Sequence, residues 1–432
     1  MQESDMKRSC VDLFSGCGGL SLGLQSAGFD CIFAIEAHAN AFQTYKKNLL
    51  DRKDGRSLWP DWLPIEPIDA VDFADRYKDY LSELNGKIDL VAGGPPCQGF
   101  STNGRRNPDD PRSRMVEAYL QIAEHIRPNL ILIENVRGFT SMPHADGGNY
   151  ADVVEFRLQE MGYQTWSDVL IASDWGVPQR RPRYFCIAAK EGTLPGIDPF
   201  ERLRTARKGF LSTRGLWPGP TTAKDALSDL EIGENTHTPD PEWGKQGFSA
   251  VVRHDNIALS AYQRLIRVGQ EGQPDDRRIP RHSAKIAERM HEIIRTCQLG
   301  VSLKPADRTR LGIGKRSTTP LAPDAPAPTV TTLPDDMIHY SDARTMSVRE
   351  MARLQSFPDW FSFCGPYTTG GSRRRDACPK YTQVGNAVPP LLAEAIGETL
   401  VGLLADQKHP KVPKSAKLGE KALPITLEVS HG

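Results

Sequence analysis

The sequence lacks the features that mark membrane, secreted and zinc-binding proteins. No uninterrupted apolar run in its 432 residues comes near the roughly 20 residues that a membrane-spanning helix needs. Residues 1–8 are charged, and no apolar stretch long enough for a secretory signal follows them. The eight cysteines include no CxxC pair, and none has a His at zinc-finger spacing. We therefore expect a cytoplasmic protein with reduced thiols, no metal site and no membrane contact.

The chain also lacks net charge, with 54 Lys/Arg against 54 Asp/Glu, so its whole surface is not an obvious polyanion binder. The charges are distributed unevenly, however. Residues 1–190 carry 21 Lys/Arg against 26 Asp/Glu, and residues 191–320 carry 21 against 16. This asymmetry favours a front part that handles a small molecule and a middle part that faces a polyanion such as nucleic acid.

Residues 9–190 alternate short apolar runs with longer helical patterns. Strands are expected at residues 9–14, 31–35, 88–92, 130–133 and 184–188. Helices are expected at residues 20–27, 39–50, 114–126 and 151–161. This alternation predicts an α/β domain with a mostly parallel sheet.

The alternation breaks down between residue 191 and about residue 343, which are rich in Pro, Gly, Arg and Asp. This part holds one amphipathic stretch near 284–297 and a Pro-rich run, 320–328, that is typical of an extended connector. Helical periodicity returns at residues 347–355 and 390–404. The Lys-rich tail from residue 406 is expected to be partly disordered.

A Gly-rich turn, Phe14-Ser15-Gly16-Cys17-Gly18-Gly19-Leu20, follows the first expected strand. Glycines there let the backbone approach a ligand at the carboxyl edge of the sheet. A dinucleotide fingerprint would have its third glycine or alanine at Ser21, so the NAD interpretation is disfavoured. Glu36 ends the next strand, at the distance where an acidic residue meets a ribose. We therefore expect a nucleoside cofactor with Glu36 on its ribose.

Two prolines hold the backbone directly before Cys97, in the run Gly93-Gly94-Pro95-Pro96-Cys97. A rigid loop at the end of an apolar strand suits a nucleophile, whereas a core cysteine needs no such setting. Another apolar strand ends in Glu134-Asn135-Val136. Burial at this position should raise the pKa of Glu134, as suits a proton donor.

Five motifs in this order resemble the cytosine-C5 DNA methyltransferases: residues 14–20, 95–98, 134–136, 179–183 (Gln-Arg-Arg-Pro-Arg) and 383–388 (Gln-Val-Gly-Asn-Ala-Val). They cover residues 9–190 and about 326–404, and the segment between them lies where the family keeps its target-recognition region. The resemblance implies an S-adenosylmethionine-dependent, Rossmann-like fold with a mixed α/β sheet and a smaller, irregular target-recognition domain.

The resemblance also implies catalytic roles. Cys97 would add to carbon 6 of cytosine, and Glu134 would hold the exocyclic amine and protonate ring nitrogen 3. Arg181 and Arg183 would lie near the base, with Arg183 on the ring carbonyl. Gln98 and Ser101 are further expected substrate contacts. The basic cluster Lys304, Arg308, Arg310, Lys315 and Arg316 is a candidate phosphate strip, with Lys315 and Arg316 as the expected DNA contacts, and a solvated surface is the alternative for any single member.

In the implied cofactor pocket, Phe14 packs on adenine, Glu36 takes the ribose hydroxyls and Asp69 meets the adenine amine, with Asp72 as a competitor for that role. The methionine end would lie on the backbone of the Gly-rich turn and on Asn386. The implied pocket residues are Phe14, Gly16, Cys17, Gly18, Gly19, Leu20, Glu36, Asp69, Pro95, Asn386 and Val388. Because Asn386 lies 370 residues after Gly16, the C-terminal helix must return to the first domain.

The expected organisation is a catalytic domain of residues 8–190 completed by residues 380–405. A target-recognition domain at 191–345, a supporting segment at 346–379 and a tail at 406–432 would follow. Double-stranded DNA is the implied partner, and the target cytosine would be flipped out of the helix. A functional pairing with a cognate restriction endonuclease is left open, and a monomer is the default expectation.

Two other functions stay open at this point. An RNA-methylating relative would keep the same cofactor turn and Cys97 but would bind a folded RNA. A catalytically silent homologue would bind DNA or a partner enzyme without turnover. The long middle segment favours duplex DNA over RNA, and the presence of Cys97, Glu134 and Arg183 favours an active enzyme over a silent one.

Overall fold

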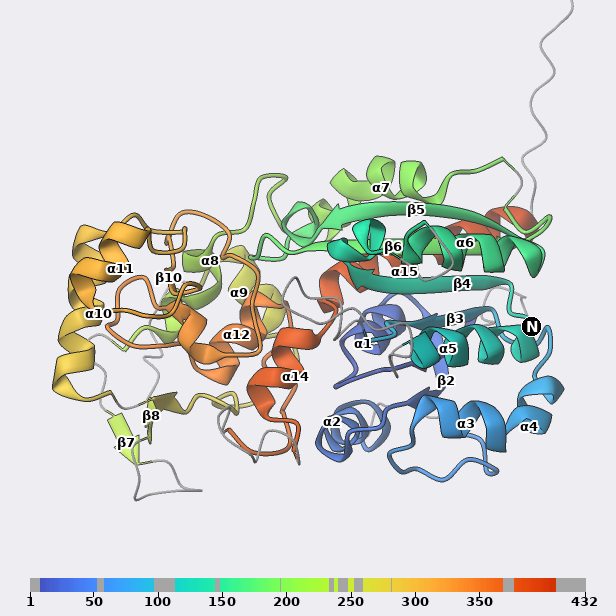
Figure 1. Cartoon of the computed structure of the whole chain (residues 1–432), viewed down its shortest axis with the longest axis horizontal. Coiled ribbons are helices and arrows are strands. Elements are labelled where there is room, and N and C mark those ends of the chain that lie inside the picture. Colours follow the sequence, from blue (N-terminus) through green and yellow to red (C-terminus); the bar gives the residue numbers. More distant parts are fainter. Residues whose placement is uncertain are drawn as a thin grey trace, which may run out of the picture.

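The computed structural model describes residues 8–52, 58–96, 113–143, 148–194, 196–232, 237–239, 248–251, 259–280, 282–367 and 377–408. These residues form two lobes (Figure 1). One lobe is built on a large sheet, and the other is made mainly of short helices and irregular loops. Helix α14 (Lys380–Asn386) lies between them.

The large sheet has six strands in the order β2-β1-β3-β4-β6-β5. Its strands are β1 (Arg8–Leu13), β2 (Phe29–Ile35), β3 (Leu90–Gly93), β4 (Leu130–Val136), β5 (Tyr163–Ile171) and β6 (Pro182–Lys190). The first four in this order are parallel, whereas β6 is antiparallel to both β4 and β5. The predicted mixed sheet is confirmed. The sequence prediction missed β5, an edge strand whose residues are mostly half-buried or exposed.

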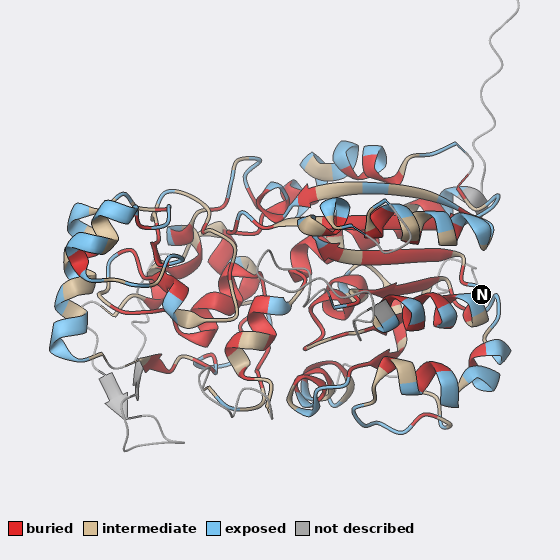
Figure 2. Ribbon diagram, viewed as in Figure 1, coloured by how far each residue is buried: buried red, intermediate tan, exposed pale blue. Residues whose placement is uncertain are grey.

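Alternate residues of the strands point into two separate cores, one on each face of the sheet. In β4, Leu130 and Leu132 belong to one core, and Ile131 and Ile133 to the other. The sheet is therefore the middle layer of three. Apart from the edge strand β5 its strands are mostly buried, while the helices around it expose their outer sides (Figure 2).

The core around Leu130 is covered by α1 (Gly19–Ser26), α7 (Pro199–Thr213) and α15 (Pro390–Lys408), with α2 (Ala39–Tyr45) and the π-helical η2 (Lys46–Leu50) at its edge. The other core is covered by α3 (Ala70–Arg76), α4 (Lys78–Glu83), α5 (Ser113–Ile126), η3 (Arg137–Ser141) and α6 (Tyr150–Glu160). Short η4 (Ala172–Trp175) follows β5. The sequence prediction assigned the residues of α7 to the target-recognition segment, but this helix packs on the sheet through Phe200 and Leu203.

Helix α15 returns to the first helix of the chain, as the sequence analysis requires. A Cβ atom on Gly23 of α1 would lie 2.4 Å from Ala393 Cβ, and one on Gly397 would lie 2.6 Å from Ala27 Cβ. Glycines therefore allow the two helices to approach closely. The stretch Lys380–Asp406 is apolar and long enough to resemble a membrane span, but 72% of its apolar window is buried inside the protein, which is typical of a core helix.

The second lobe holds the remaining short elements. They are α8 (Ala223–Leu227), η5 (Ser228–Leu230), β7 (His237–Pro239), β8 (Phe248–Val251), α9 (Ala261–Ile266), β9 (Ile279–Pro280), α10 (Ala284–Thr296), α11 (Pro305–Leu311), β10 (Thr319–Pro320), η6 (Pro334–Asp336), β11 (Met337–Ile338) and α12 (Val348–Leu354). The Pro-rich run, predicted to be an extended connector, contains a turn at residues 323–324 and is packed against the protein, because Leu321 and Ala327 are buried.

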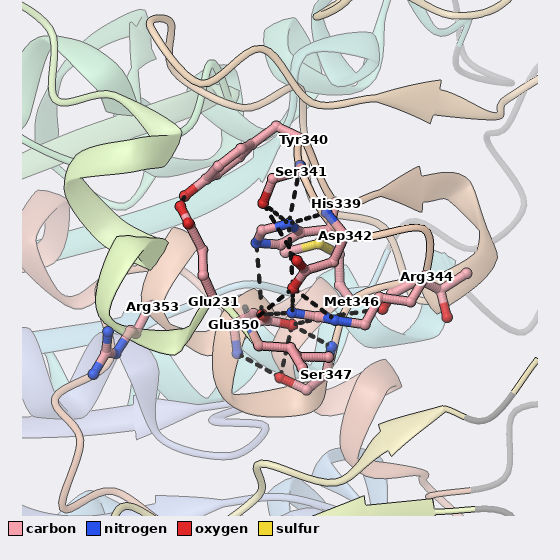
Figure 3. A network of polar contacts seen from close by, with 12 residues as sticks. Glu231, His339, Tyr340, Ser341, Asp342, Arg344, Met346, Ser347, Glu350 and Arg353 are labelled. Atoms are coloured by element: carbon pink, nitrogen blue, oxygen red, sulfur yellow. Dashed lines mark hydrogen bonds and ion pairs between the residues drawn. The ribbon is translucent and has the colours of Figure 1, made fainter. Parts of the chain in front are cut away.

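A buried polar network fixes the start of α12 (Figure 3). The Arg344 guanidinium donates to both carboxylate oxygens of Glu350 at 2.7 and 2.8 Å, and Glu350 also accepts from the Ser347 backbone N–H at 2.7 Å. Burial and the charge of Arg344 lower the pKa of His339 to about 4, so this imidazole is neutral inside the network. At the end of the helix, Arg353 pairs with Asp229 and Asp359. These contacts join α12 to the loop before it and to η5.

Candidate active site

The Gly-rich turn after β1 depends on unusual backbone angles. Phe14, Gly16 and Gly18 have φ values of 58°, 55° and 97°. The backbone of Gly18 has a conformation that favours glycine. A side chain would not fit there either, because a Cβ atom would lie 2.7 Å from Leu49 Cδ1. The Gly18 N–H closes the turn on the Ser15 carbonyl at 2.9 Å.

Glu36 holds this turn from the end of β2. One carboxylate oxygen accepts from the Gly16 N–H at 2.9 Å, and the other accepts from the His38 N–H at 2.7 Å. Burial raises the pKa of Glu36, and the two N–H groups counteract part of that effect. Because each carboxylate oxygen can accept a further hydrogen bond, Glu36 can also bind two neighbouring hydroxyls such as those of a ribose.

Asp69 lies next to Glu36 and caps α3, with its carboxylate accepting from the Val71 N–H at 2.8 Å. The preceding residue, Ile68, donates its N–H to the Glu36 carbonyl at 2.9 Å, which brings the two acidic residues to one edge of the sheet. Asp72 is exposed on the first turn of α3. Of the two candidates for the adenine amine, Asp69 is the one that the backbone ties to Glu36.

The C-terminal motif meets the Gly-rich turn from the other side. The Val388 carbonyl oxygen would lie 2.4 Å from a Cβ on Gly19, and the Cys17 thiol donates to the Gln383 carbonyl at 3.7 Å. The side chains of Cys17 and Leu20 are buried in the core, so only their backbone can face a cofactor. Asn386 is exposed at the end of α14.

Two observations indicate room for a polar ligand beside this turn. The Ser15 hydroxyl is buried and has no hydrogen-bond partner among the described residues. A Cβ on Gly16 would meet nothing within 4 Å, so space lies open beside this residue of the turn. A polar ligand over the turn would fill that space and could satisfy the hydroxyl.

On the neighbouring strands, Glu134 and Arg183 form a salt bridge of 3.0 Å between Oε1 and Nε. The two residues are diagonal neighbours in the antiparallel pairing of β4 with β6. Each side chain is 12% exposed. Burial raises the pKa of Glu134, and the charges of Arg183 and Arg181 only partly oppose that rise. Glu134 is thus an acid that holds its proton more tightly than an exposed carboxyl does.

The loop that precedes Cys97 lies directly over Glu134. The Asn135 side chain donates to the Pro95 carbonyl at 3.2 Å, and a Cβ on Gly94 would lie 2.9 Å from Glu134 Oε2. Three predicted site residues, Cys97, Gln98 and Ser101, lie outside the described residues. The described part of the loop ends at Pro96, two residues after Gly94, which lies against the carboxyl group of Glu134.

Arg181 differs from Arg183 in its surroundings. It is 1% exposed, and its two terminal nitrogens donate to the carbonyls of Val330 and Gly385 at 3.0 and 2.8 Å. Burial and the neighbouring charge of Arg183 lower its pKa, and Glu134 opposes this effect. Arg181, directly before β6, therefore bonds to the C-terminal motif. Arg183, within β6, is the arginine that pairs with Glu134.

Lys315 and Arg316, the predicted phosphate contacts, are placed differently from one another. The Lys315 ammonium pairs with Asp336 at 2.8 Å and with Asp335 at 3.1 Å. Arg316 is exposed. The pattern of basic residues in the sequence could not separate these two environments.

Several buried polar residues that the sequence analysis gave no role hold the motifs together. Gln179 donates to the Leu354 carbonyl at 3.1 Å and accepts from the Val330 N–H at 2.7 Å. Gln383 accepts from the Thr44 hydroxyl at 2.7 Å. Below the Gly-rich turn, the Ser21 hydroxyl donates to the buried Asp12 carboxylate at 2.6 Å. Gln179 and Gln383 are the first residues of two motifs named in the sequence analysis, and this position was the sequence signal that could have pointed to their role.

Comparisons with known proteins agree with this arrangement. The family model described as C-5 cytosine-specific DNA methylase matches residues 8–402. The Type II methyltransferase M.AgeI of Thalassovita gelatinovora is 32% identical, over 90% of this chain and 98% of that protein. M.DdeI of Desulfomicrobium norvegicum is 30% identical, over 90% of this chain and 88% of that protein.

A crystal structure from E. coli, described as that of a DNA modification methyltransferase encoded within a prophage, has a TM-score of 0.62 and 27% identity to this chain. The similarity covers 92% of this chain and 99% of that one. Family model, relatives and fold all coincide over nearly the full length. The chain therefore belongs to the C-5 cytosine-specific DNA methylase family, whose members transfer a methyl group from S-adenosylmethionine to carbon 5 of cytosine in DNA.

Proposed function

We propose that this protein methylates carbon 5 of a cytosine within a specific duplex sequence, with Cys97 as nucleophile and Glu134 as proton donor. The observation that carries the proposal is the buried pair of Glu134 and Arg183 beside Pro95, two residues before Cys97. The cofactor turn lies at the same carboxyl edge of the sheet, because β1, β3 and β4 are parallel neighbours.

Cytosine needs help at carbon 5 because this atom is a weak nucleophile. Addition of the Cys97 thiolate to carbon 6 forms a sulfur–carbon bond and shifts the electron pair of the C5–C6 double bond to carbon 5, from which it is shared with ring nitrogen 3. A proton from Glu134 at ring nitrogen 3 neutralises the charge that would otherwise build up there. Arg183, which pairs with Glu134, is placed to hold the ring carbonyl. After methylation, removal of the carbon-5 proton and departure of Cys97 restore the double bond.

The cofactor would be held by the residues that line the turn. Phe14 would pack on the adenine, Glu36 would bind the ribose hydroxyls and Asp69 would meet the adenine amine. Backbone groups of residues 16–20, Pro95, Asn386 and Val388 would enclose the methionine end. When bound there, S-adenosylmethionine would supply a methyl group activated by its positively charged sulfur; carbon 5 would take the methyl carbon, and the sulfur would leave as the neutral thioether S-adenosylhomocysteine.

The target base lies inside the duplex stack, so the protein must flip it outward to reach carbon 6. We propose that residues 191–345 supply the DNA contacts that select the sequence, and that residues 8–190 with 380–405 form the catalytic domain, joined by residues 346–379. Helix α7 belongs structurally with the catalytic sheet. The type II names of the relatives support a pairing with a restriction endonuclease. We place the protein in the cytoplasm, as the sequence analysis expects.

The decisive experiment combines methylation sequencing with a covalent trap. DNA from cells that express the chain should carry 5-methylcytosine within one discrete motif. In a duplex of that motif with 5-fluorocytosine at the target, the purified protein should form a stable adduct, because fluorine cannot leave as a proton does. Cys97→Ala should bind the same duplex without an adduct.

Each alternative outcome is distinct. An adduct that forms with Cys97→Ala would remove this residue from the role of nucleophile. Unmodified DNA together with methylated cellular RNA would move the activity to RNA. Unmodified DNA and RNA with intact cofactor binding would indicate a silent homologue.

A further inference from the structure

Residues 327–333, here called the strap, contact residues 179–181 on one side and Gly385 of the C-terminal motif on the other. The Arg180 N–H donates to the Ala327 carbonyl at 2.8 Å, and the Val330 N–H donates to the Gln179 side chain at 2.7 Å. The Val330 carbonyl accepts from Arg181 at 3.0 Å. The strap therefore contacts residues 179–181, the segment directly before β6, at successive points along its length.

The same strap also touches the cofactor side. The Thr331 carbonyl oxygen would lie 2.4 Å from a Cβ on Gly385, directly before Asn386. The Gly385 carbonyl in turn accepts from Arg181 at 2.8 Å. Since Arg181 bonds to the strap and to Gly385 together, a shift of the strap would move both contacts at once.

The far end of the strap is anchored by one carboxylate. Asp336 is 6% exposed, and it accepts a hydrogen bond from the Thr331 hydroxyl. Its other oxygen accepts from the Lys315 ammonium at 2.8 Å and from the Ser317 hydroxyl at 2.5 Å. Burial alone would raise the pKa of Asp336, but its hydrogen bonds with Lys315, Ser317 and Thr331 outweigh burial and lower it. The anchor is an ionised group with charge-assisted bonds.

We propose that Asp336, with Lys315 as its counter-ion, is a positioning group for methyl transfer that fixes Thr331 and thereby holds the strap against Arg181 and Gly385. This proposal rests on the roles proposed above for Arg183 and Asn386. In this proposal Lys315 pairs with Asp336 inside the protein and does not make the contact with a DNA phosphate that is expected from the sequence. The exposed Arg316 then remains as the phosphate contact.

The first test compares Thr331→Val with Thr331→Ser. Valine keeps the shape of threonine but loses the hydroxyl that bonds to Asp336, whereas serine keeps it. Thr331→Val should lower kcat by about tenfold and weaken S-adenosylhomocysteine binding severalfold, with the KM for DNA nearly unchanged. Thr331→Ser, which retains the hydroxyl, should keep most of the wild-type kcat. A role in stability alone would not separate kcat from KM in this way.

The second test separates Lys315 from Arg316 by salt dependence. In binding assays with the target duplex, Arg316→Ala should reduce the slope of log K against log salt by about one. Lys315→Ala should leave that slope unchanged and should weaken S-adenosylhomocysteine binding as Thr331→Val does. Asp336→Asn should resemble Lys315→Ala.

These outcomes distinguish the two proposals. A wild-type protein that binds S-adenosylhomocysteine but methylates no cytosine would contradict the proposed function. Wild-type kcat and S-adenosylhomocysteine affinity in folded Thr331→Val would overturn the positioning role. So would a Lys315→Ala variant whose only change is a smaller salt slope. If Asp336→Asn does not fold, the threonine pair still decides.

Discussion

Arg183 holds Glu134 through a contact of 3.0 Å between Nε and Oε1, across the antiparallel pairing of β6 with β4. The pair is nearly buried, so the carboxyl group is controlled by two opposing influences, desolvation and the arginine charge. Desolvation is the larger one, and the pKa of Glu134 is raised. A carboxyl group in this state can give a proton to a ring nitrogen and take it back within one catalytic cycle.

Replacing Glu134 by Gln should lower kcat by about 10²- to 10⁴-fold, because the amide keeps the shape but has no proton to transfer. Duplex binding should change little. The measurement is single-turnover methylation with the target duplex, next to a binding titration. The matched control is Glu124→Gln on α5, an exposed position remote from the motifs. A Glu134→Gln variant with the wild-type rate would exclude Glu134 as the acid.

Replacing Glu36 by Gln should weaken S-adenosylhomocysteine binding by about tenfold or more. The amide can no longer accept from the Gly16 and His38 N–H groups with both of its terminal atoms, so one donor loses its partner. Isothermal titration calorimetry gives the affinity directly. Glu66→Gln, on the exposed loop before α3, should bind like the wild type. Equal affinities for both variants would remove Glu36 from the pocket.

Asp12 makes the stability depend on pH. Burial raises the pKa of this carboxyl from 3.8 to about 7, although the Ser21 hydroxyl acts in the opposite direction. Between these values the folded state keeps a proton that the unfolded state has lost, so stability falls as pH rises towards 7. Asp12→Asn, which resembles the protonated acid, should remove on the order of 2 kcal/mol of this dependence.

Urea unfolding at about pH 5 and about pH 8 checks this prediction. The difference in unfolding free energy between the two conditions should be smaller for Asp12→Asn than for the wild type. Asp72→Asn, on the exposed first turn of α3, should keep the wild-type difference. An undiminished pH dependence in Asp12→Asn would show that other groups cause it.

Gly385→Ala should destabilise the protein by about 1–3 kcal/mol and weaken cofactor binding, because the new methyl group would meet the Thr331 carbonyl at 2.4 Å. Gly402→Ala in α15 is the control, since a Cβ there meets nothing within 4 Å. Alanine in that helix should be neutral or stabilising by up to about 1 kcal/mol. Thermal unfolding of both variants tests the difference, and similar melting temperatures would contradict the close approach.

Much of the sheet could be predicted because its strands are continuous apolar runs bounded by motif residues, as at residues 130–133. Strand β5 was missed because an edge strand needs only part of its surface buried, so Tyr163–Ile171 has no such run. The position of Glu36 and Glu134 at one edge of the sheet followed from the carboxyl ends of parallel strands. Arg183 was expected near the base only from the family resemblance, because it lies at the start of β6, whose antiparallel direction was not predicted. The separate environments of Arg181 and Lys315 could not be predicted, because partners such as Val330 and Asp336 are set by tertiary packing and not by spacing.

The return of α15 to α1 has a consequence for biosynthesis. The Gly-rich turn leaves the ribosome early, yet Val388, which lies against Gly19 of this turn, is added only after more than 360 further residues. Closing such a long loop is slow and entropically unfavourable compared with local folding. The cofactor pocket is therefore finished last, and a nascent chain that stops within the second lobe cannot assemble it. If the turn binds the methyl donor as proposed, this binding requires a chain that extends past the second lobe, so methyl-donor binding reports on a nearly complete chain.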